Sequence, residues 1–410
     1  GDHRELHSFP TRRSSDLKVN AGDNLLKIAR LNGFNIPGLC YHHKLTPTGA
    51  CRLCLVKIDG MRGLVASCTI AVQDGMKVTA FDAELEDTRR FLLDYLLSEQ
   101  NDDYDFTYND ELRDLMFRYG LDNKENRFFK PIKPNPNFRI DDSSPVLSYD
   151  PCKCIKCFRC IKACDEVQGK NVLSFNERGM DSYIIAGLGV WGKSECDGCG
   201  ECIQLCPTGA IVERPNRHTI KLNNIEKRVR TTCPYCGVGC QIELLVQDGK
   251  IMRSNGVEGV SPNDGRLCVK GRFGYEFVHS PERLTKPLIK RNGKFEESTW
   301  DEALDLVVNK FNELKQKYGS DSLAGYASAK CTNEDNYIFQ RFIRTAFGTN
   351  NIDYCTRLCH ASTVTAMLKS IGDGAGSNSI EDFETTDCLL VTGNNIIETH
   401  PITATYVKRG

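Results

Sequence analysis

The sequence predicts a multidomain chain that joins α+β and α/β parts, and three observations lead to this prediction. Sixteen of the 21 cysteines fall into four sets of four with short, regular spacings. Residues 18–80 alternate short apolar runs with glycine turns, which is typical of a small mixed β domain. From Thr231 onward, long amphipathic segments and a short apolar run follow one another, which is typical of an α/β domain.

Composition excludes several classes of protein. Lys and Arg number 53 and Asp and Glu number 54, so no net charge attracts nucleic acid or a lipid surface. No apolar run approaches the roughly 20 residues that span a bilayer. The C-x2-C spacings favour bound metal over disulfides, and intact metal–thiolate clusters favour a reducing compartment, so we expect a cytoplasmic protein.

Local patterns predict several elements. Asp59-Gly60 lies between two apolar runs and predicts a β-hairpin. Residues 86–97 predict an amphipathic helix, and residues 388–392 predict a buried strand of a parallel sheet. The expected apolar face of the helix consists of Phe91, Leu92, Tyr95 and Leu96.

A second long helix is expected after residue 299. Thr299 and Glu302 have the spacing of a capping box, which marks a helix start. Apolar residues then recur at helical spacing and predict a buried face. That face consists of Leu304, Val307, Val308, Phe311 and Leu314.

The first set of cysteines suits a two-iron cluster. Its members are Cys40, Cys51, Cys54 and Cys68, separated by ten, two and thirteen residues. The spacing differs from the plant-type C-x4-C-x2-C, but the long first gap contains Pro47 and Gly49 and can loop around a cluster. A zinc ribbon is the alternative, although zinc usually takes two close cysteine pairs and this set has one. The set resembles the N-terminal ferredoxin-like domain of complex I large subunits, NAD-linked hydrogenases and NAD-linked formate dehydrogenases.

The second and third sets repeat one four-iron motif, C-x2-C-x2-C-x3-C. They are Cys154, Cys157, Cys160 and Cys164, followed by Cys196, Cys199, Cys202 and Cys206. In two-cluster ferredoxins the fourth cysteine of each run binds the cluster of the other run. We therefore expect Cys206 to complete the first cluster and Cys164 to complete the second. Cys152 lies outside the spacing and is expected to be a bystander.

The fourth set has two close spacings and one long gap. Its members are Cys233, Cys236, Cys240 and Cys268. Spacing alone allows a four-iron cluster or zinc. The surrounding sequence, C-P-Y-C-G-V-G-C and then C-V-K-G-R, resembles the start of molybdenum or tungsten bis-molybdopterin-guanine-dinucleotide oxidoreductases. The resemblance implies that cofactor, and it implies that Lys270 lies between the cluster and the pterin.

A cysteine beside a histidine follows near the C-terminus. Residues 351–360 resemble the active-site segment of formate dehydrogenases, in which a cysteine or selenocysteine binds molybdenum or tungsten and is followed by His. The resemblance implies that Cys359 is a metal ligand and that His360 contacts substrate or accepts a proton. A purely structural Cys-His pair is the alternative.

Other residues of this region are assigned from their context. Gly393, Asn394 and Asn395 follow the predicted strand, where the nucleotide tail of a cofactor could bind, and an ordinary strand-to-helix loop is the alternative. Three further cysteines are expected to be buried apolar thiols. They are Cys331, Cys355 and Cys388.

The resemblance covers residues 18–410 and implies a domain order. We expect a non-native leader at 1–17 and a β-grasp 2Fe-2S ferredoxin-type domain at 18–96. A linker with a degenerate His-plus-three-Cys cluster region follows at 97–140, and then a bacterial-type two-[4Fe-4S] ferredoxin domain at 141–220. The last two parts are a 4Fe-4S domain of the bis-molybdopterin type at 226–282 and the start of a molybdopterin oxidoreductase α/β domain at 283–410. Residues 98–110 contain neither Cys nor His. The additional cluster that many relatives hold with one His and three Cys is therefore expected to be absent.

Taken together, these features predict the N-terminal part of the catalytic subunit of a formate dehydrogenase of the type linked to NAD(P). Its cofactors would be one 2Fe-2S cluster, three 4Fe-4S clusters and a Mo or W bis-molybdopterin guanine dinucleotide. Formate would lose two electrons and a proton to give CO2. A separate flavin-containing subunit or another acceptor subunit would take the electrons, because no G-x-G-x-x-G motif is present.

Two alternatives stay open. One is a complex I-like large subunit that only conducts electrons, against which Cys359, His360 and Lys270 argue. The other is a different bis-molybdopterin reductase such as nitrate reductase, whose periplasmic type uses Cys without the following His.

Overall fold

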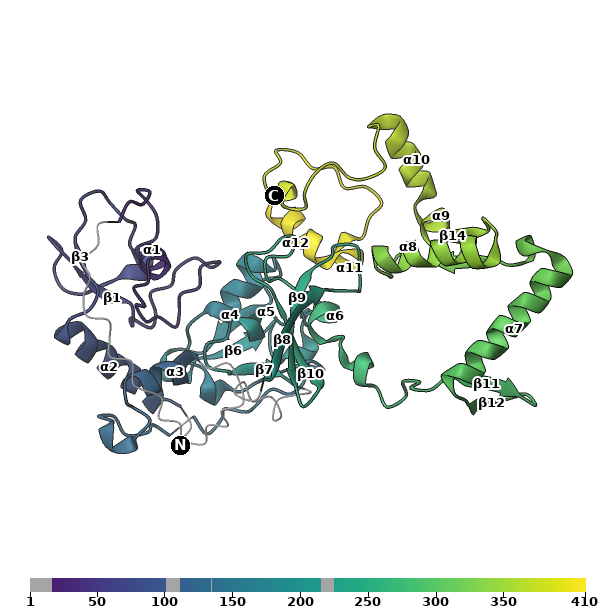
Figure 1. Cartoon of the computed structure of the whole chain (residues 1–410). Coiled ribbons are helices and arrows are strands. Elements are labelled where there is room, and N and C mark those ends of the chain that lie inside the picture. The colour runs from purple at the N-terminus through teal and green to yellow at the C-terminus, as the bar shows by residue number, and fades with distance from the viewer. Residues whose placement is uncertain (1–16, 101–110, 134, 215–224) are drawn as a thin grey trace. The chain divides into compact units, whose positions relative to one another are not determined.

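The computed structural model describes residues 17–100, 111–133, 135–214 and 225–410 (Figure 1). Most of the expected leader and residues 101–110 of the cysteine-free stretch lie outside these ranges. The chain forms two compact units. Apart from the last two residues, the first unit comprises Gly1–Thr231 with Cys240–Phe273, and the second comprises Thr232–Gly239 with Gly274–Lys408.

The first unit begins with a small antiparallel sheet and one helix, drawn in purple in Figure 1. The strands, in spatial order, are β2 (Val65–Ala66), β1 (Leu55–Ile58) and β3 (Val78–Thr79). The hairpin predicted at Asp59-Gly60 is confirmed, because β1 pairs with β2 across this turn and Gly60 takes a left-handed φ of 85°. Helix α1 (Leu25–Leu31) begins at Asn24, whose side chain accepts a hydrogen bond from the Lys27 N–H.

The helix predicted over 86–97 is present as α2 (Ala83–Ser98). The predicted apolar face is correct for Leu92 and Leu96, which pack against a core cluster, and wrong for Phe91 and Tyr95. Phe91 and Tyr95 are 50% and 39% exposed and contact the Phe129 ring instead. The buried face includes residues one helical turn apart: Leu85, Arg89, Leu93 and Leu97. Helical spacing of apolar residues did not reveal that the charged Arg89 lies on the buried face.

Arg89 is fully buried because backbone carbonyl groups surround its guanidinium. Its Nε donates to Leu53 O at 3.2 Å, and its Nη2 donates to Leu55 O at 2.6 Å and to Ala80 O at 2.8 Å. Its Nη1 pairs with Glu86 at 2.6 Å. Arg89 therefore fixes α2 against β1, the strand that follows the second and third cysteines of the first set.

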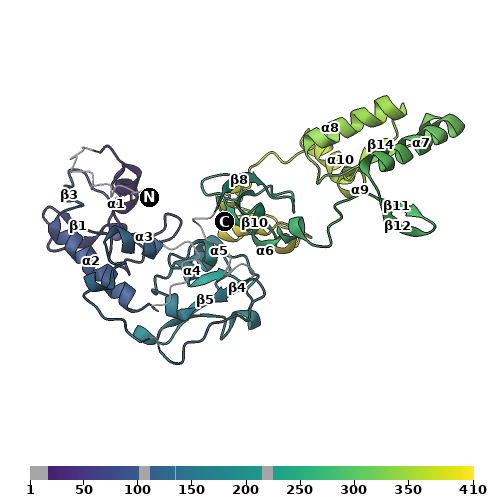
Figure 2. The same cartoon turned by 60° about the horizontal axis from the view of Figure 1, so that its bottom comes forward.

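The cysteine-rich middle of the first unit consists of two strand pairs and two short helices (Figure 2). The antiparallel pairs are β4 (Leu147–Tyr149) with β7 (Ile211–Glu213), and β5 (Leu173–Asn176) with β6 (Tyr183–Ala186). The helices are α4 (Arg159–Lys162) and α5 (Glu201–Gln204), which contact each other. Leu147, Ile184, Trp191 and Ile203 are among the residues of one core that also includes cysteines of both runs. The strands therefore hold the two cysteine runs against a shared interior.

A third sheet completes the first unit. Its strands, in spatial order, are β10 (Lys250–Gly256), β9 (Gln241–Gln247) and β8 (Lys227–Thr232). Asp248 and Gly249, both with positive φ, form the two-residue turn between β9 and β10. Helix α6 (Val269–Phe273) contacts β10, and the Ser254 hydroxyl donates to Gly271 O at 2.8 Å. Short helix α3 (Glu111–Arg118) packs on α2.

The second unit contains a hairpin, a parallel strand pair and several helices. They are β11 (Leu288–Arg291) with β12 (Lys294–Glu297), β13 (Gly325–Ala327) with β14 (Ile352–Tyr354), α7 (Trp300–Tyr318), α8 (Asn333–Phe342), α9 (Thr356–Cys359), α10 (Ala361–Ser370), α11 (Ile396–Thr399) and α12 (Pro401–Arg409). The N-cap predicted at Thr299 is confirmed, since its hydroxyl accepts from the Glu302 N–H at 3.2 Å. The Glu302 carboxylate instead binds the Ser298 hydroxyl and Arg291.

Two predictions for the second unit are wrong. Four residues of the expected buried face of α7, Leu304, Val307, Val308 and Phe311, are exposed. Leu314 packs against a core cluster, and the Phe311 ring contacts Phe347 of the same cluster. Residues 388–392 form no strand, and Leu390 is 86% exposed. The described part of this unit has only two parallel strands, so neither the helix face nor the apolar run meets a sheet. Among the described residues, no helix is long and apolar enough to cross a bilayer.

Candidate metal centres

Four cysteine sulfurs from separate segments come together beside the first sheet. Cys40 follows α1, Cys51 and Cys54 precede β1, and Cys68 lies in the turn after β2; all four are buried. The Cys51 backbone N–H points to Cys40 Sγ at 3.5 Å, and the Leu39 N–H points to Cys51 Sγ at 3.3 Å. Backbone donors to sulfur are among the features that tune an iron–sulfur cluster.

Hydrogen bonds among these four thiols lower the pKa of two of them and raise the pKa of the other two. Hydrogen bonds from Cys51 and Cys68 lower the pKa of Cys40 to about 2, and the same contacts raise the pKa of Cys51 and Cys68. A hydrogen bond from Cys68 lowers the pKa of Cys54 to about 7. The four sulfurs are therefore within reach of one another, and they fit a metal group that takes deprotonated thiolates.

The two repeated runs exchange their fourth cysteines in the structure. One cavity is lined by Cys154, Cys157, Cys160 and Cys206, together with Tyr149, Ile184 and other apolar residues. A second cavity is lined by Cys164, Cys196, Cys199 and Cys202, together with Trp191 and Leu173. Each cavity thus has the four sulfurs that a 4Fe-4S cluster needs, in apolar surroundings, so the residues fit that group.

Left-handed backbone at matching positions shapes both runs. Lys156 and Phe158 have φ of 57° and 68°, and Gly198 and Gly200 have φ of 68° and 72° at the equivalent positions. The first of each pair directs its N–H toward sulfur, and Lys156 N lies 3.4 Å from Cys154 Sγ. Non-glycine residues rarely adopt this conformation, so the first run contains local strain that glycine avoids in the second.

Burial opposes charge on these sulfurs. It raises the pKa of Cys154 to about 11 and also raises the pKa of Cys160, Cys199 and Cys202. Because metal ions bind thiolates, cluster assembly at these sites must displace protons that the buried thiols otherwise keep.

The cysteines of the fourth set fall in both units. Cys233 and Cys236 belong to the second unit, whereas Cys240 and Cys268 belong to the first. Cys233 and Cys240 are buried, and the other two are partly buried. Lys270 is the second residue of α6 and is exposed.

The candidate metal ligand near the C-terminus lies at a junction between two helices. Cys359 ends α9, and His360 precedes α10, with His360 Nε2 at 3.8 Å from Cys359 Sγ. Both side chains are exposed, as are most residues of this segment. Gly393, Asn394 and Asn395 form an exposed loop before α11, where the Asn395 amide donates to Glu398 at 2.9 Å.

The expectation for the remaining thiols is wrong. Cys331, Cys355 and Cys388 are exposed, because the described second unit lacks elements that would cover them. Cys152 is partly buried and lines neither of the two cavities.

Sequence reasoning missed two buried arginines beside the cysteine runs. Arg159 precedes Cys160 and is 2% exposed, and Arg272 follows Cys268 by four residues and is fully buried. For Arg159, the available sequence signal was its position between the ligand cysteines Cys157 and Cys160.

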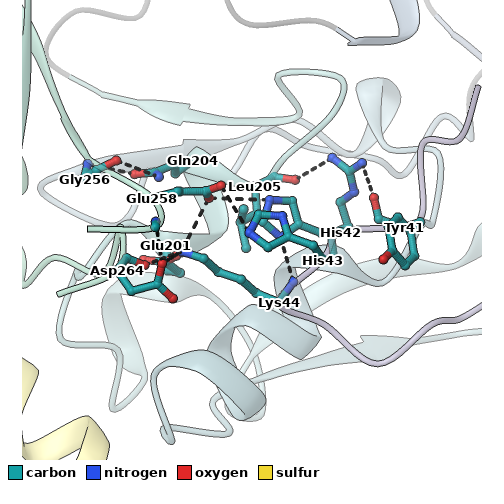
Figure 3. Close-up of polar contacts among 12 residues, drawn as sticks. Tyr41, His42, His43, Lys44, Glu201, Gln204, Leu205, Gly256, Glu258 and Asp264 are labelled. Atoms are coloured by element: carbon teal, nitrogen blue, oxygen red, sulfur yellow. Dashed lines mark hydrogen bonds and ion pairs between the residues drawn. The ribbon is translucent and has the colours of Figure 1, made fainter. Parts of the chain in front are cut away.

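Sequence reasoning also missed a polar group in the loop that follows Cys40 (Figure 3). His42 Nε2 and His43 Nε2 lie 3.5 Å and 3.7 Å from the two Glu258 carboxylate oxygens. Such a group could hold a metal ion, but the Lys44 ammonium already lies 3.6 Å from the same carboxylate and 3.5 Å from Asp264. Burial lowers the pKa of His42 to about 3, so this imidazole is neutral at pH 7. The group is therefore an ion pair of Lys44 that connects the Cys40 loop to the segment after β10.

Known protein families match successive parts of the chain. Four family profiles match: a 2Fe-2S iron-sulfur cluster binding domain at residues 15–82, the ferredoxin-like domain of NADH-quinone oxidoreductase subunit 3 at 144–212, the molybdopterin oxidoreductase Fe4S4 domain at 226–280 and molybdopterin oxidoreductase at 283–409. Residues 226–409 thus match the two molybdopterin oxidoreductase domains, and the residues before them match iron–sulfur domains.

Individual relatives match along nearly the whole chain. A Bacillus subtilis (strain 168) protein named as an oxidoreductase, YjgC, is 31% identical over 96% of this chain and 44% of its own length. A Staphylococcus aureus (strain MSSA476) protein assigned by name as a formate dehydrogenase is 30% identical over 98% of this chain and 44% of its own length. The chain therefore spans less than half the length of these relatives. An NAD+-reducing [NiFe]-hydrogenase structure matches 48% of the chain at 30% identity and a TM-score of 0.44.

Replacing Gly200 should destroy the second four-iron site. A Cβ at Gly200 would lie 2.2 Å from Arg272 Cδ, and φ is 72°. Arg272 is buried and held by hydrogen bonds, so it cannot move aside cheaply. We expect Gly200→Ala to lower the iron content by about four atoms per chain, measured by metal analysis.

Gly179→Ala is the matched control, because Gly179 has a similar φ of 63° with open space at its Cβ position. It incurs only the backbone cost of about 1–2 kcal/mol and should keep full iron content. Equal iron in both variants would contradict the packing argument.

Proposed function

We propose that this chain is the electron-conducting and metal-binding N-terminal part of a formate dehydrogenase. The single observation that carries the proposal is the exposed Cys359–His360 pair, with sulfur and imidazole nitrogen 3.8 Å apart, in a segment of molybdopterin oxidoreductase sequence. The formate dehydrogenase assignment of relatives at 30% identity supports the substrate.

The residues of the chain fit the group that the family implies. A soft thiolate at Cys359 suits a metal that already has sulfur ligands. The exposed loop at Gly393, Asn394 and Asn395 has the backbone and amide groups to bind a nucleotide tail. When bound, a molybdopterin centre supplies the two-electron chemistry, and the chain supplies orientation and proton handling.

Two side chains have distinct tasks in this proposal. Formate is oxidised to CO2 with release of two electrons and one proton. The Cys359 sulfur would bind the metal, and the His360 imidazole would accept the proton or orient the formate carboxylate.

The four cysteine sets would hold the iron–sulfur clusters, which would carry electrons away from the site one at a time. The proposed order passes from the fourth cysteine set, beside Lys270, to the paired runs and then to the first set. A flavin-containing subunit that reduces NAD(P) is the proposed acceptor. The ferredoxin-like match to NADH-quinone oxidoreductase subunit 3 supports this type of partner.

The same match favours one rival, a chain that conducts electrons and has no pterin chemistry. The two proposals differ in metal content. A purified full-length protein with clusters but without Mo, W or pterin would favour the rival. Nitrate-dependent turnover without formate-dependent turnover would favour a nitrate reductase.

Iron analysis tests the number of clusters. Sixteen cysteines in one two-iron and three four-iron sites require about 14 iron atoms per chain. Metal analysis of the anaerobically purified protein should give this value, and about 18 would indicate a further cluster that the proposal excludes.

Substitution of Cys359 and His360 tests the chemistry. Cys359→Ala should abolish formate-dependent dye reduction in the full-length protein while the iron content stays constant. His360→Ala should keep the bound Mo or W but lower turnover by about a hundredfold or more, the range for losing an acid–base group.

Cys355→Ala is the matched control, because Cys355 is an exposed cysteine only four residues earlier. It should retain normal kinetics per bound metal. Full activity in Cys359→Ala would refute the proposed role of this thiolate.

A further inference from the structure

We infer that Arg159 and Arg272 are positioning residues for electron transfer: each guanidinium joins segments that carry ligands of successive clusters, and the Arg159 charge raises the reduction potential of the adjoining four-iron cluster. The inference rests on the iron–sulfur part of the proposed function and is independent of formate as the substrate.

Arg159 connects the first cysteine set to the first four-iron cavity. It lies between Cys157 and Cys160, and its Nη2 donates to Tyr41 O at 2.7 Å, one residue after Cys40. Its Nη1 lies 3.4 Å from Leu205 O, one residue before Cys206. One buried side chain thus spans the backbone beside ligands of two different sites.

Glu111 holds the Arg159 guanidinium in this place. The two groups form a bidentate pair, with Nη1 to Oε1 at 2.5 Å and Nη2 to Oε2 at 3.0 Å. Arg159 is 3% exposed at its side chain, whereas Glu111 is 41% exposed. Water therefore screens the carboxylate more than the guanidinium, and net positive character remains in the interior.

Arg272 makes the corresponding connection at the second four-iron cavity. It lies in α6, four residues after Cys268, and its Nε donates to Cys199 O at 2.7 Å. Its Nη1 donates to Gln204 at 2.7 Å, and its Nη2 pairs with Glu201 at 3.3 Å. The backbone of Gly256 in β10 forms two hydrogen bonds with the Gln204 amide, so α6, β10 and α5 are fixed together.

The Arg159 charge lies close to ligands of the first four-iron cavity. Arg159 directly precedes Cys160, and its Nη1 lies 3.4 Å from the carbonyl oxygen of Leu205, the residue before Cys206. A guanidinium cannot lose its proton in a protein. It therefore stabilises added negative charge, and one electron added to a cluster is such a charge.

One buried nitrogen supports the assignment further. Arg159 Nε is buried and has no hydrogen-bond partner among the described residues. A sulfur atom of a cluster bound by Cys157 and Cys160 would carry negative charge and could accept a hydrogen bond from this N–H. The electron step itself moves one electron from a reduced cluster to an oxidised neighbour, and the guanidinium keeps its proton throughout.

A redox titration of the dithionite-reduced chain with its clusters, followed by EPR, tests the inference without formate. The relevant signal is the one that disappears in Cys157→Ser. Arg159→Gln should lower its reduction equilibrium constant about tenfold, which is about 59 mV for one electron. Glu111→Gln should shift the same signal to higher potential, because it leaves the Arg159 charge unopposed. A purely structural role for the pair would not produce shifts of opposite sign.

Two further variants complete the design. Arg159→Lys keeps the charge but loses the planar fork, so the potential should stay while electron exchange with the two-iron site slows after pulse reduction. Lys153→Gln is the control, since Lys153 is next to Cys154 but is partly exposed and should change the potential much less.

The outcomes separate the possible failures. Equal potentials in Arg159→Gln and Lys153→Gln, or shifts of the same sign in Arg159→Gln and Glu111→Gln, would overturn the inference. If Arg159→Gln loses its clusters, Arg159→Lys and Glu111→Gln still decide. Absence of iron–sulfur signals from the unmodified chain would refute the proposed function itself.

Discussion

The exchange of the fourth cysteines between two short runs is the constraint on which the centre of the first unit depends. Cys164 lines the cavity of the second run, and Cys206 lines the cavity of the first. Each cavity therefore needs both halves of the segment folded at once. The strand pairs β4–β7 and β5–β6 provide the frame, and the matching left-handed residues before α4 and α5 turn each run around its cavity. In such a small domain, bound clusters supply stability that the apolar core alone cannot.

Buried arginines accompany the two cavities that the paired cysteine runs form. Thiolate clusters carry negative charge inside the protein, where charge is unfavourable. A permanent cation nearby compensates for that negative charge. Arg159 provides that charge beside the first four-iron cavity, and the more exposed Glu111 holds it in place. Arg272 is paired with Glu201, which is equally buried, and acts by joining segments. The hydrogen bonds of the two arginines tie the first cysteine set and α6 to the central domain. In Arg159, structural attachment and redox tuning are therefore properties of the same side chain.

The second and third cysteine sets could be predicted from the sequence because metal–thiolate spacing is a local property of the chain, and both sets line shared cavities. The exchange of Cys164 and Cys206 followed from the repeat of the spacing, and the Asp59-Gly60 hairpin followed from turn chemistry. Part of the face of α2 was missed because Arg89 is buried by carbonyl groups from distant strands, which no helical periodicity reveals. The exposed face of α7 and the unformed strand at 388–392 were missed because burial depends on elements outside the local pattern. The roles of Arg159 and Arg272 also depend on long-range contacts.

The most direct test of the account is the EPR spectrum of Cys206→Ser in the reduced chain, compared with Cys157→Ser and Cys199→Ser. Although Cys206 belongs to the run of Cys199 in sequence, its sulfur lines the cavity of Cys157. The account predicts that the four-iron signal altered by Cys206→Ser is the one lost in Cys157→Ser, while the signal lost in Cys199→Ser stays intact. Alteration of the Cys199 signal alone would contradict the exchange of ligands and the electron path built on it.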